Sequence, residues 1–346
     1  MSQPDTITYS VVIPTCDRLD VLPEVLAALA AQGPARNHGV PPFEVVVVDD
    51  GSTDGTWPWL EAHRGEFDIP IRIYRQENAG PAKARNWGVT HALGDRLAFL
   101  GDDTVPDTGW LASHHHAYER RRQQLDAGQS LAVIGYTCWH ERMRQNPFLR
   151  YINEYGLQFG YALIDDPENV PFNFLYTSNL TLPRQALLDE PFDLGFPYPA
   201  WEDIELSYRL TRAGLRIVYE PNAVARHDHP TDLGRFTTRQ EKAGYSAVVF
   251  HRLHPELGPF LGLGPEGPPA SPPRWRQLVR EWLARSLRFS PVEFPGMSQL
   301  WDELFRWHYI QGLHRGWRDR LSQEAMPFTA GPTVEDATQE DRGDQP

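Results

Sequence analysis

The chain has 346 residues, 40% of them hydrophobic, which is enough for one large α/β domain with additions or for two domains. The formal net charge of -13 at pH 7 argues against a general nucleic-acid-binding protein, because phosphate contacts require a basic surface. The two cysteines, Cys16 and Cys138, lie far apart, so the sequence supports neither a disulfide framework nor a cysteine metal site. Because the N-terminus has no signal-peptide pattern and no stretch approaches about 18 apolar residues, we expect a cytoplasmic protein without a transmembrane segment.

Strands and helices alternate from residue 7 to residue 100. Runs of β-branched or apolar residues predict strands at residues 7–13, 43–48, 69–74 and 97–100, and helical periodicity with turn residues predicts a helix after each of the first three. Strands joined by helices are parallel, so we expect an α/β fold with a Rossmann-like, mostly parallel sheet flanked by helices. Residues 1–105 are therefore predicted to form a nucleotide-binding half.

The pattern is looser from residue 106 to residue 257, which we predict to hold the second substrate. Helices are expected over residues 110–122 and 201–213, and strands over residues 130–136, 173–182 and 215–225. The aromatic stretch over residues 146–170 is predicted to be irregular.

The C-terminal part divides into three segments by composition. Prolines and glycines predict a linker over residues 258–273, and residues 274–325 are predicted to form a helical extension. Within it, residues 274–288 would form an amphipathic helix that packs on the preceding domain or a second subunit, or lies on a membrane surface. Residues 326–346 are acidic and poor in large apolar side chains, so they are predicted to be a disordered tail.

Two pairs of adjacent aspartates, Asp49–Asp50 and Asp102–Asp103, each follow a predicted parallel strand. The carboxyl ends of such strands lie at the sheet edge where α/β proteins bind ligands. Two carboxylates there suit a divalent cation that carries phosphate, and hydrogen bonds to a base or ribose would keep Asp49 or Asp50 ionised. Taken alone, the sequence Gly101-Asp102-Asp103 could also be only a turn with a helix cap.

Basic residues close to these strands in the sequence could hold a diphosphate. Arg18 follows the first strand, and Lys83 and Arg85 lie on the helix that leads to Asp102. A solvated helix face is the alternative for Lys83 and Arg85.

A second acidic cluster, Glu202 and Asp203, lies at the start of a predicted helix. Acids in a first helical turn interact favourably with the helix dipole, and the same dipole keeps a carboxylate ionised, as a general base requires. His227 and His229 follow a predicted strand two residues apart. They could bind a metal ion, or they could be a surface feature.

Seven segments, taken in order, resemble the family 2 glycosyltransferases of the GT-A fold. They are VVIPTCDR (residues 11–18), VVVVDDGSTDGT (45–56), NAGPAKARNWGV (78–89), AFLGDDTVPDTGWL (98–111), TSNLTLPR (177–184), WEDIELSYRLTRAGLRIVY (201–219) and HDHP (227–230). The resemblance covers about residues 8–255 and makes residues 1–105 and 106–257 the donor and acceptor halves of one GT-A domain.

The resemblance implies a role for each matching residue. Asp102 would contact ribose, Asp103 and His227 would bind Mn2+ or Mg2+ with His229 as the alternative ligand, and Asp203 or its neighbour Glu202 would be the catalytic base. The implied donor-binding residues are Pro14, Thr15, Asp17, Arg18, Asp49, Asp50, Lys83, Arg85, Asn86, Asp102 and Asn179. Two departures from the family pattern, Gly101 in place of a carboxylate and Cys16 in place of an aromatic residue, leave the ligand register and the nucleotide base open.

We therefore expect an inverting, metal-dependent transferase that moves a sugar from a nucleotide-diphospho-sugar, expected to be UDP-linked, to the hydroxyl of a carbohydrate or other acceptor. No nucleic-acid partner is expected, while oligomerisation through the C-terminal helices and peripheral membrane contact stay open. One alternative is a non-catalytic nucleotide-sugar-binding protein. Another is a sugar-phosphate nucleotidyltransferase, although such enzymes usually have a glycine-rich loop where residues 14–18 contain no glycine.

Overall fold

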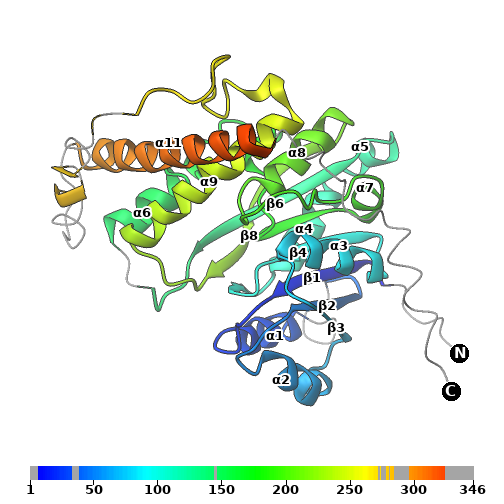
Figure 1. Cartoon of the computed structure of the whole chain (residues 1–346). Coiled ribbons are helices and arrows are strands. Elements are labelled where there is room, and N and C mark those ends of the chain that lie inside the picture. Colours follow the sequence, from blue (N-terminus) through cyan, green and yellow to red (C-terminus); the bar gives the residue numbers. More distant parts are fainter. Residues whose placement is uncertain are drawn as a thin grey trace, which may run out of the picture.

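The computed structural model describes residues 7–32, 39–143, 146–271, 273, 278–279, 281–283 and 296–323. The strands are β1 (Tyr9–Thr15), β2 (Phe43–Asp50), β3 (Ile71–Gln76), β4 (Arg96–Leu100), β5 (Thr104–Pro106), β6 (Leu131–Trp139), β7 (Asn179–Pro183) and β8 (Arg216–His227). They form one sheet in the order β3-β2-β1-β4-β7-β6-β8-β5 (Figure 1). The predicted α/β class is confirmed. The predicted tail and most of the segment 274–288 lie outside the described residues.

Strands β1 to β4 form a parallel half-sheet that is covered on both faces. All eight residues of β2 are buried, as expected for a strand between two helical layers. Helix α1 (Leu22–Ala30) shares a core with Val45 and Val47 of β2, whereas α3 (Pro81–His91) shares a core with Val46 and Val48. Because successive strand residues point to opposite faces, these two helices cover the two sides of the sheet. Helix α2 (Thr56–His63) and the 3-10 helix η1 (Arg64–Glu66) connect β2 to β3.

The second half extends the same sheet with strands of mixed direction. Strand β7 is antiparallel to β4 and β6, β6 is parallel to β8, and β5 is antiparallel to β8. Other elements of this half include α4 (Trp110–Glu119), α5 (Arg122–Asp126), η2 (Tyr161–Leu163), η3 (Phe172–Phe174), α7 (Arg184–Asp189) and α8 (Glu202–Arg212). The register pairs Thr104 of β5 with His227 of β8. This pairing brings the end of β8 next to the Asp102–Asp103 turn.

The structure corrects three expectations about secondary structure. The strand expected over residues 173–182 begins only at Asn179, after the 3-10 helix η3. The stretch 146–170, expected to be irregular, begins with α6 (Pro147–Glu154), whose first turn is capped by the Asn146 side chain accepting from the Leu149 amide at 2.9 Å. No helix was predicted between residue 230 and the linker, yet α9 (Leu233–Leu253) occupies it and is capped by Asp232. Both helices begin with the Asn or Asp cap that helix starts favour.

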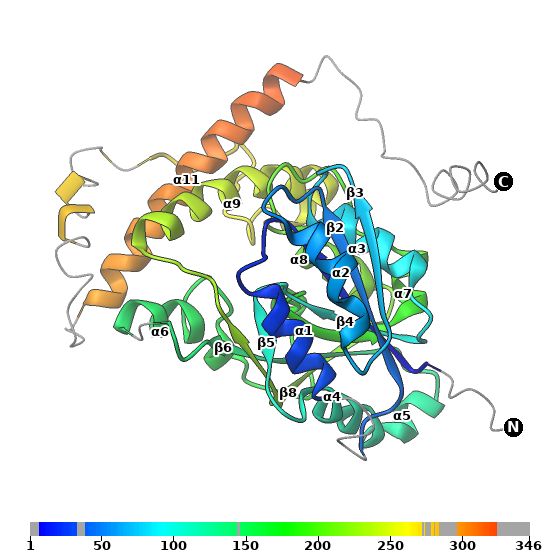
Figure 2. The same cartoon turned by 90° about the horizontal axis from the view of Figure 1, so that it is seen from below.

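The C-terminal helix α11 (Met297–Gln323) packs against α9, and the two views show them crossing at close range (Figures 1 and 2). Glycines allow this approach, because a Cβ at Gly244 or at Gly312 would come within 2.0 Å of a carbonyl oxygen on the other helix. Residues 258–271 follow α9 and η4 (Pro255–Leu257) without a regular helix or strand, but Leu261 and Leu263 are buried against α9 and α11. The proline-rich segment is therefore anchored to both helices.

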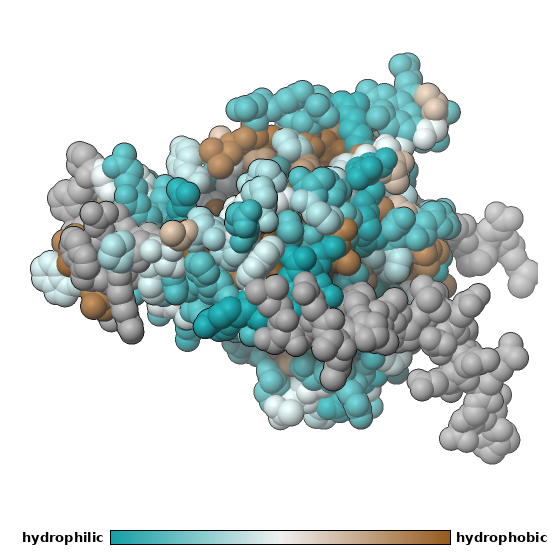
Figure 3. Space-filling view, turned by 45° about the horizontal axis from the view of Figure 1, so that its top comes forward, coloured by the Kyte–Doolittle hydropathy of each residue, from teal (hydrophilic) through white to brown (hydrophobic). Residues whose placement is uncertain are grey.

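The outer surface agrees with a chain whose apolar residues are mostly inside. Figure 3 shows a face that is mainly hydrophilic, with hydrophobic residues gathered toward its upper edge. None of the helices in the described part of the chain has both the length and the apolar character that a membrane crossing requires.

Replacing Gly312 by alanine is expected to destabilise the junction of α9 and α11. The new methyl group would lie 2.0 Å from the Glu241 carbonyl oxygen, so the helices must separate. Overpacking of this kind costs about 1–3 kcal/mol, partly offset by the better helix propensity of alanine. Thermal unfolding should show a midpoint lowered by a few degrees. Gly65→Ala, where no atom lies within 4 Å of the new Cβ, is the matched control and should leave the midpoint unchanged.

Candidate active site

A cleft of about 1210 Å³ lies along the carboxyl ends of the parallel strands and is closed on its far side by α8, α9 and α11. It collects most of the residues that the sequence analysis selected. Those lining it are Pro14, Thr15, Arg18, Asp50, Arg85, Asp102, Asp103, Glu202, Asp203, His227 and His229.

Asp103, His227 and His229 form a cluster that could hold a metal ion, because one candidate ligand atom from each lies within 4.8 Å of the others. The His227 Nε2 atom lies 3.3 Å from one Asp103 carboxylate oxygen, and the His229 Nδ1 atom lies 3.0 Å from the other. Burial disfavours the charged carboxylate, but the attraction of His227 and the hydrogen bonds from both histidines hold the pKa of Asp103 well below its usual range. The cluster therefore presents an ionised carboxylate and two imidazoles.

The pairing of β5, β6 and β8 holds these side chains in place. The Trp139 ring stacks on His227 with centroids 5.4 Å apart, and His227 stacks on His229 at 5.6 Å. The Nδ1 atom of His227 is buried without a hydrogen-bond partner. An imidazole–carboxylate set of this composition fits a divalent cation such as Mn2+.

Arg18 lies against the same cluster and joins it to Asp102. Its guanidinium is 3.6 Å from the Asp102 carboxylate, 3.5 Å from that of Asp103 and 3.2 Å from His229 Nδ1. Asp102 accepts a hydrogen bond from the Cys16 amide at 3.3 Å, and burial together with the neighbouring charge of Asp103 raises the pKa of Asp102 to about 7. The Arg18 charge partly offsets the repulsion between the two aspartates.

The carboxylates of Asp17 and Asp50 organise the loops that follow β1 and β2. Asp17 has a left-handed backbone, with φ at 53°, and one of its oxygens accepts from the amides of Thr53 at 2.6 Å and Asp54 at 3.1 Å. Asp50 accepts from the amides of Ala79 at 2.8 Å and of the next residue at 2.9 Å, just before α3. These bonds join the loop after β1 to the loop after β2, and the end of β2 to α3.

Glu202 and Asp203 open α8 at the opposite side of the cleft. The residue before them, Trp201, has φ at 76°, and its indole donates to the Ala243 carbonyl of α9 at 2.9 Å. A left-handed backbone is strained for tryptophan and persists only when neighbouring contacts hold it. The hydrogen bond from Trp201 to α9 is such a contact, and it fixes the residue at which α8 begins. Glu202 forms an ion pair with Arg85 at 3.2 Å.

Asp203 has no such counter-ion among the described residues, and its carboxylate accepts from the backbone amides of Ile204, at 2.9 Å, and of Thr177. Burial and the adjacent negative charge of Glu202 raise the pKa of Asp203 to about 7, against the opposing attraction of Arg85. A carboxylate with its pKa near neutrality is well matched to accept a proton from a hydroxyl group.

Residues 10–180 match a family model described as Glycosyl transferase family 2. The chain belongs to this family. It is 30% identical over 281 residues to the validoxylamine A glucosyltransferase of Streptomyces hygroscopicus subsp. jinggangensis, and the matched segment covers 73% of this chain and 62% of that protein. It is 28% identical over 222 residues to the pre-mycofactocin glycosyltransferase of Mycobacterium tuberculosis, and the matched segment covers 62% of this chain and 43% of that protein. This family 2 chain thus spans less than two thirds of the length of either relative.

The fold resembles that of the mannosyltransferase PcManGT from Pyrobaculum calidifontis, solved in complex with GDP-Man and Mn2+. The TM-score is 0.50 at 15% identity, over 98% of this chain and 83% of that chain. The GT-A architecture expected for a family 2 chain is therefore confirmed at the level of the fold, including the C-terminal helix.

In the part of the chain that the structure describes, five of the residues selected from the sequence do not line the cleft. They are Asp17, Asp49, Lys83, Asn86 and Asn179. Asn86 exchanges two hydrogen bonds of 2.9 Å with the backbone of Phe192. The Asn179 oxygen accepts from the side chains of Trp110 and His114, and its nitrogen donates to two backbone carbonyls. Both amide groups are thus used in holding the fold together, while Lys83 is exposed on α3.

The other two are also engaged with the protein. Asp49 is fully buried and forms an ion pair with Arg75 at 3.1 Å, and Asp17 is held by the loop after β2. Conversely, residues that the sequence analysis did not select also line the cleft of this family 2 chain. They include Trp139, Arg235, Arg239, Phe260, Arg306 and Tyr309. The sequence analysis had no signal for Arg235 and Arg239, because it predicted no helix there; only once α9 is known does their spacing of four residues put both on one face of it.

Proposed function

We propose that the chain is an inverting, metal-dependent glycosyltransferase that moves a sugar from a nucleotide-diphospho-sugar, expected to be UDP-linked, to an acceptor hydroxyl. The observation that carries the proposal is that one cleft has the Asp103–His227–His229 cluster on one side and Asp203 on the other. The names of the two curated relatives, a glucosyltransferase and a glycosyltransferase, support sugar transfer. The Mn2+ and GDP-Man recorded for the Pyrobaculum enzyme support a metal-assisted nucleotide-sugar site.

The donor would bind with its diphosphate at the metal cluster and its nucleoside toward Thr15 and Asp50. A divalent cation held by Asp103, His227 and His229 would offset the charge that develops on the leaving diphosphate. Arg18 lies close enough to this cluster to donate hydrogen bonds to the same phosphate oxygens.

Asp203 would accept the proton of the acceptor hydroxyl as that oxygen attacks the anomeric carbon. In an inverting transfer the nucleophile and the leaving group lie on opposite faces of the sugar, which requires the base to face the metal cluster across the cleft. The ion pair between Glu202 and Arg85 keeps the neighbouring carboxylate occupied, so Asp203 is the acid of this pair that is available to the acceptor.

A screen of nucleotide sugars by thermal shift, with and without Mn2+, tests the donor half of the proposal. Any compound that binds only the folded state raises the unfolding midpoint by mass action, so the donor can be found before the acceptor is known. The expected result is stabilisation by UDP-linked sugars that requires Mn2+. Stabilisation by another nucleotide only would contradict the expected base, and no stabilisation by any nucleotide sugar would contradict the function.

The rate of nucleoside diphosphate release at saturating donor and Mn2+ is expected to rise with pH through about pH 7. Asp203 acts as a base only when it is ionised, and its pKa is raised to about 7, so protonation removes activity as the pH falls below that value. On the acidic side the rate should fall about tenfold per pH unit. If the rate of nucleoside diphosphate release does not change between pH 5 and pH 8, Asp203 is not the base.

A further inference from the structure

Three arginines line the acceptor side of the cleft without a carboxylate partner. Arg235 and Arg239 lie one turn apart on α9, and Arg306 lies on α11. All three are exposed, and none forms an ion pair with a carboxylate in the described ranges of the chain. In a protein with 46 acidic and 33 basic residues, three uncompensated guanidinium groups in one cleft are a distinctive feature.

Two of these guanidinium groups are oriented by neutral groups. Arg235 donates to the Pro230 carbonyl at 2.6 Å, and Arg239 donates to the Gln158 side chain and lies over the Phe236 ring at 6.0 Å. A guanidinium has five donors, so most of them stay available in this arrangement. The neutral partners fix the direction of the group and leave its charge for a ligand.

The other arginines of the cleft behave differently. Arg18 is paired with Asp102 and Asp103, and Arg85 is paired with Glu202. The charges of Arg18 and Arg85 are therefore balanced by the carboxylates of the donor and base sites. The charges of Arg235, Arg239 and Arg306 are not balanced by an ion pair in the described part of the chain.

The position of Arg239 assigns this free charge to the acceptor. Arg239 lies one helical turn before Ala243 of α9, whose carbonyl accepts from the indole of Trp201, the residue directly before Glu202 and Asp203. The charges of these two carboxylates also act on the Arg239 guanidinium. It therefore lies on the side of the base. The base contacts the attacking oxygen, which approaches from the face of the sugar opposite the diphosphate.

We propose that Arg235, Arg239 and Arg306 form a subsite for an anionic group, a phosphate or a carboxylate, carried by the acceptor. This proposal rests on the proposed glycosyl transfer and adds the chemical class of the acceptor. Guanidinium groups bind both anions through paired, charge-assisted hydrogen bonds. Arg306 comes from α11, beyond the residues that match the family model, so the C-terminal helix would contribute to acceptor choice.

The test is a thermal-shift titration of the full chain with glucose 6-phosphate, inorganic phosphate and glucose, with and without saturating UDP and Mn2+. The two anions are expected to raise the midpoint in a saturable way also when UDP and Mn2+ are bound, whereas glucose is not. In Arg239→Gln and in Arg306→Gln the apparent dissociation constant for glucose 6-phosphate should be about tenfold weaker, the loss expected for one charge-assisted hydrogen bond. The response to UDP and Mn2+ should be unchanged in both variants.

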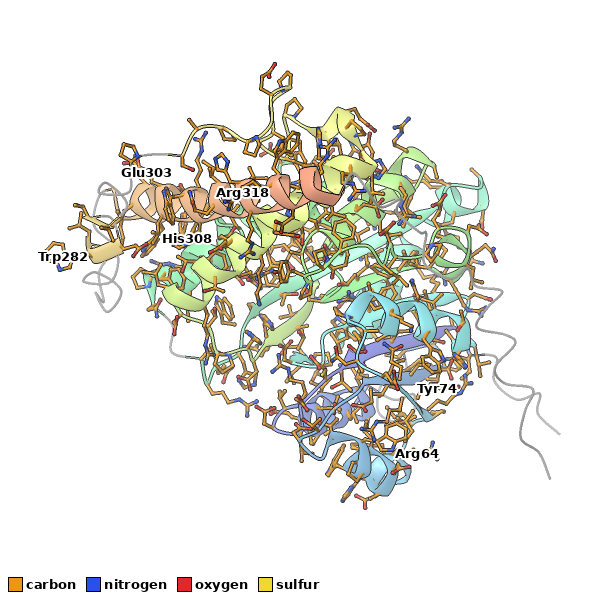
Figure 4. The ribbon with its side chains drawn as sticks, in the orientation of Figure 1. Arg64, Tyr74, Trp282, Glu303, His308 and Arg318 are labelled. Atoms are coloured by element: carbon orange, nitrogen blue, oxygen red, sulfur yellow. The ribbon has the colours of Figure 1, made fainter. Side chains whose placement is uncertain are left out.

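Arg64→Gln is the matched control, because Arg64 is an exposed arginine of η1 at the far end of the molecule from α11 (Figure 4). It removes the same charge and should keep wild-type affinity for glucose 6-phosphate. If the arginine variants lose the response to UDP instead, the three residues bind the donor diphosphate and the proposal is wrong. Equal responses to phosphate in all proteins, or no response in the wild type, would also overturn it. A wild type that binds glucose 6-phosphate but no nucleotide would contradict the proposed function while supporting the anion subsite.

Discussion

Asp203→Asn is expected to lower kcat by about 10² to 10⁴ while donor affinity changes little. Asparagine keeps the size of the side chain, and its amide oxygen can still accept from the Ile204 amide, so the start of α8 should be preserved. What is lost is the ability to take a proton. The measurement is the rate of nucleoside diphosphate release at saturating donor, together with the donor dissociation constant from calorimetry.

Glu202→Gln is the paired control, and the structure predicts a different effect for it. Glu202 is buried and paired with Arg85, so it is not positioned as the base, but its charge raises the pKa of Asp203. Removing that charge should leave the enzyme active and move the acidic limb of its pH profile to lower pH. An inactive Glu202→Gln beside an active Asp203→Asn would place the base one residue earlier. If both variants keep wild-type rates, the base lies elsewhere.

The parallel half of the fold was predictable because its strands carry a strong local signal. Strand β2 is buried along its whole length, and a strand covered on both faces shows an unbroken apolar run such as Val45–Val48. Helix α9 was missed for the opposite reason. It contains Gly234 and Gly244, which disfavour a helix, and Gly244 is needed because α11 approaches too closely for a side chain. That requirement comes from tertiary packing and leaves no local pattern.

The candidate site likewise has features that the sequence could predict and features that depend on tertiary packing. The approach of Asp103 to His227 was expected only from the resemblance of short segments, because the sequence analysis did not predict β5, whose pairing with β8 brings the two residues together. Residue type alone could not show that the amide of Asn179 is fully used inside the fold. Nor could spacing bring Arg239 and Arg306 into one cleft, since they come from helices that meet only in the folded chain.

Asp103→Asn is expected to abolish the effect of Mn2+ on nucleotide binding. The carboxylate lies between the two histidines and supplies the cluster's only negative charge within the described ligand set. Loss of a residue that merely orients a metal ligand costs about 10–100-fold in affinity, so loss of this ligand should weaken Mn2+-dependent binding by more than about 100-fold. Calorimetric titration of the nucleotide with Mn2+ or with a chelator measures the change. Asp126→Asn, at an exposed position on α5, is the control and should bind as the wild type does.

His227→Ala and His229→Ala then determine which histidine is the stronger ligand. The His227 side chain is 12% exposed and stacked between Trp139 and His229, whereas that of His229 is 42% exposed. A ligand held in one orientation gives up less conformational freedom on binding a metal ion, so His227→Ala should cause the larger loss of Mn2+-dependent affinity. Equal losses would indicate that both imidazoles bind with similar strength. Tight nucleotide binding by the wild type in the presence of a chelator would show that the cluster does not hold a metal ion in the donor complex.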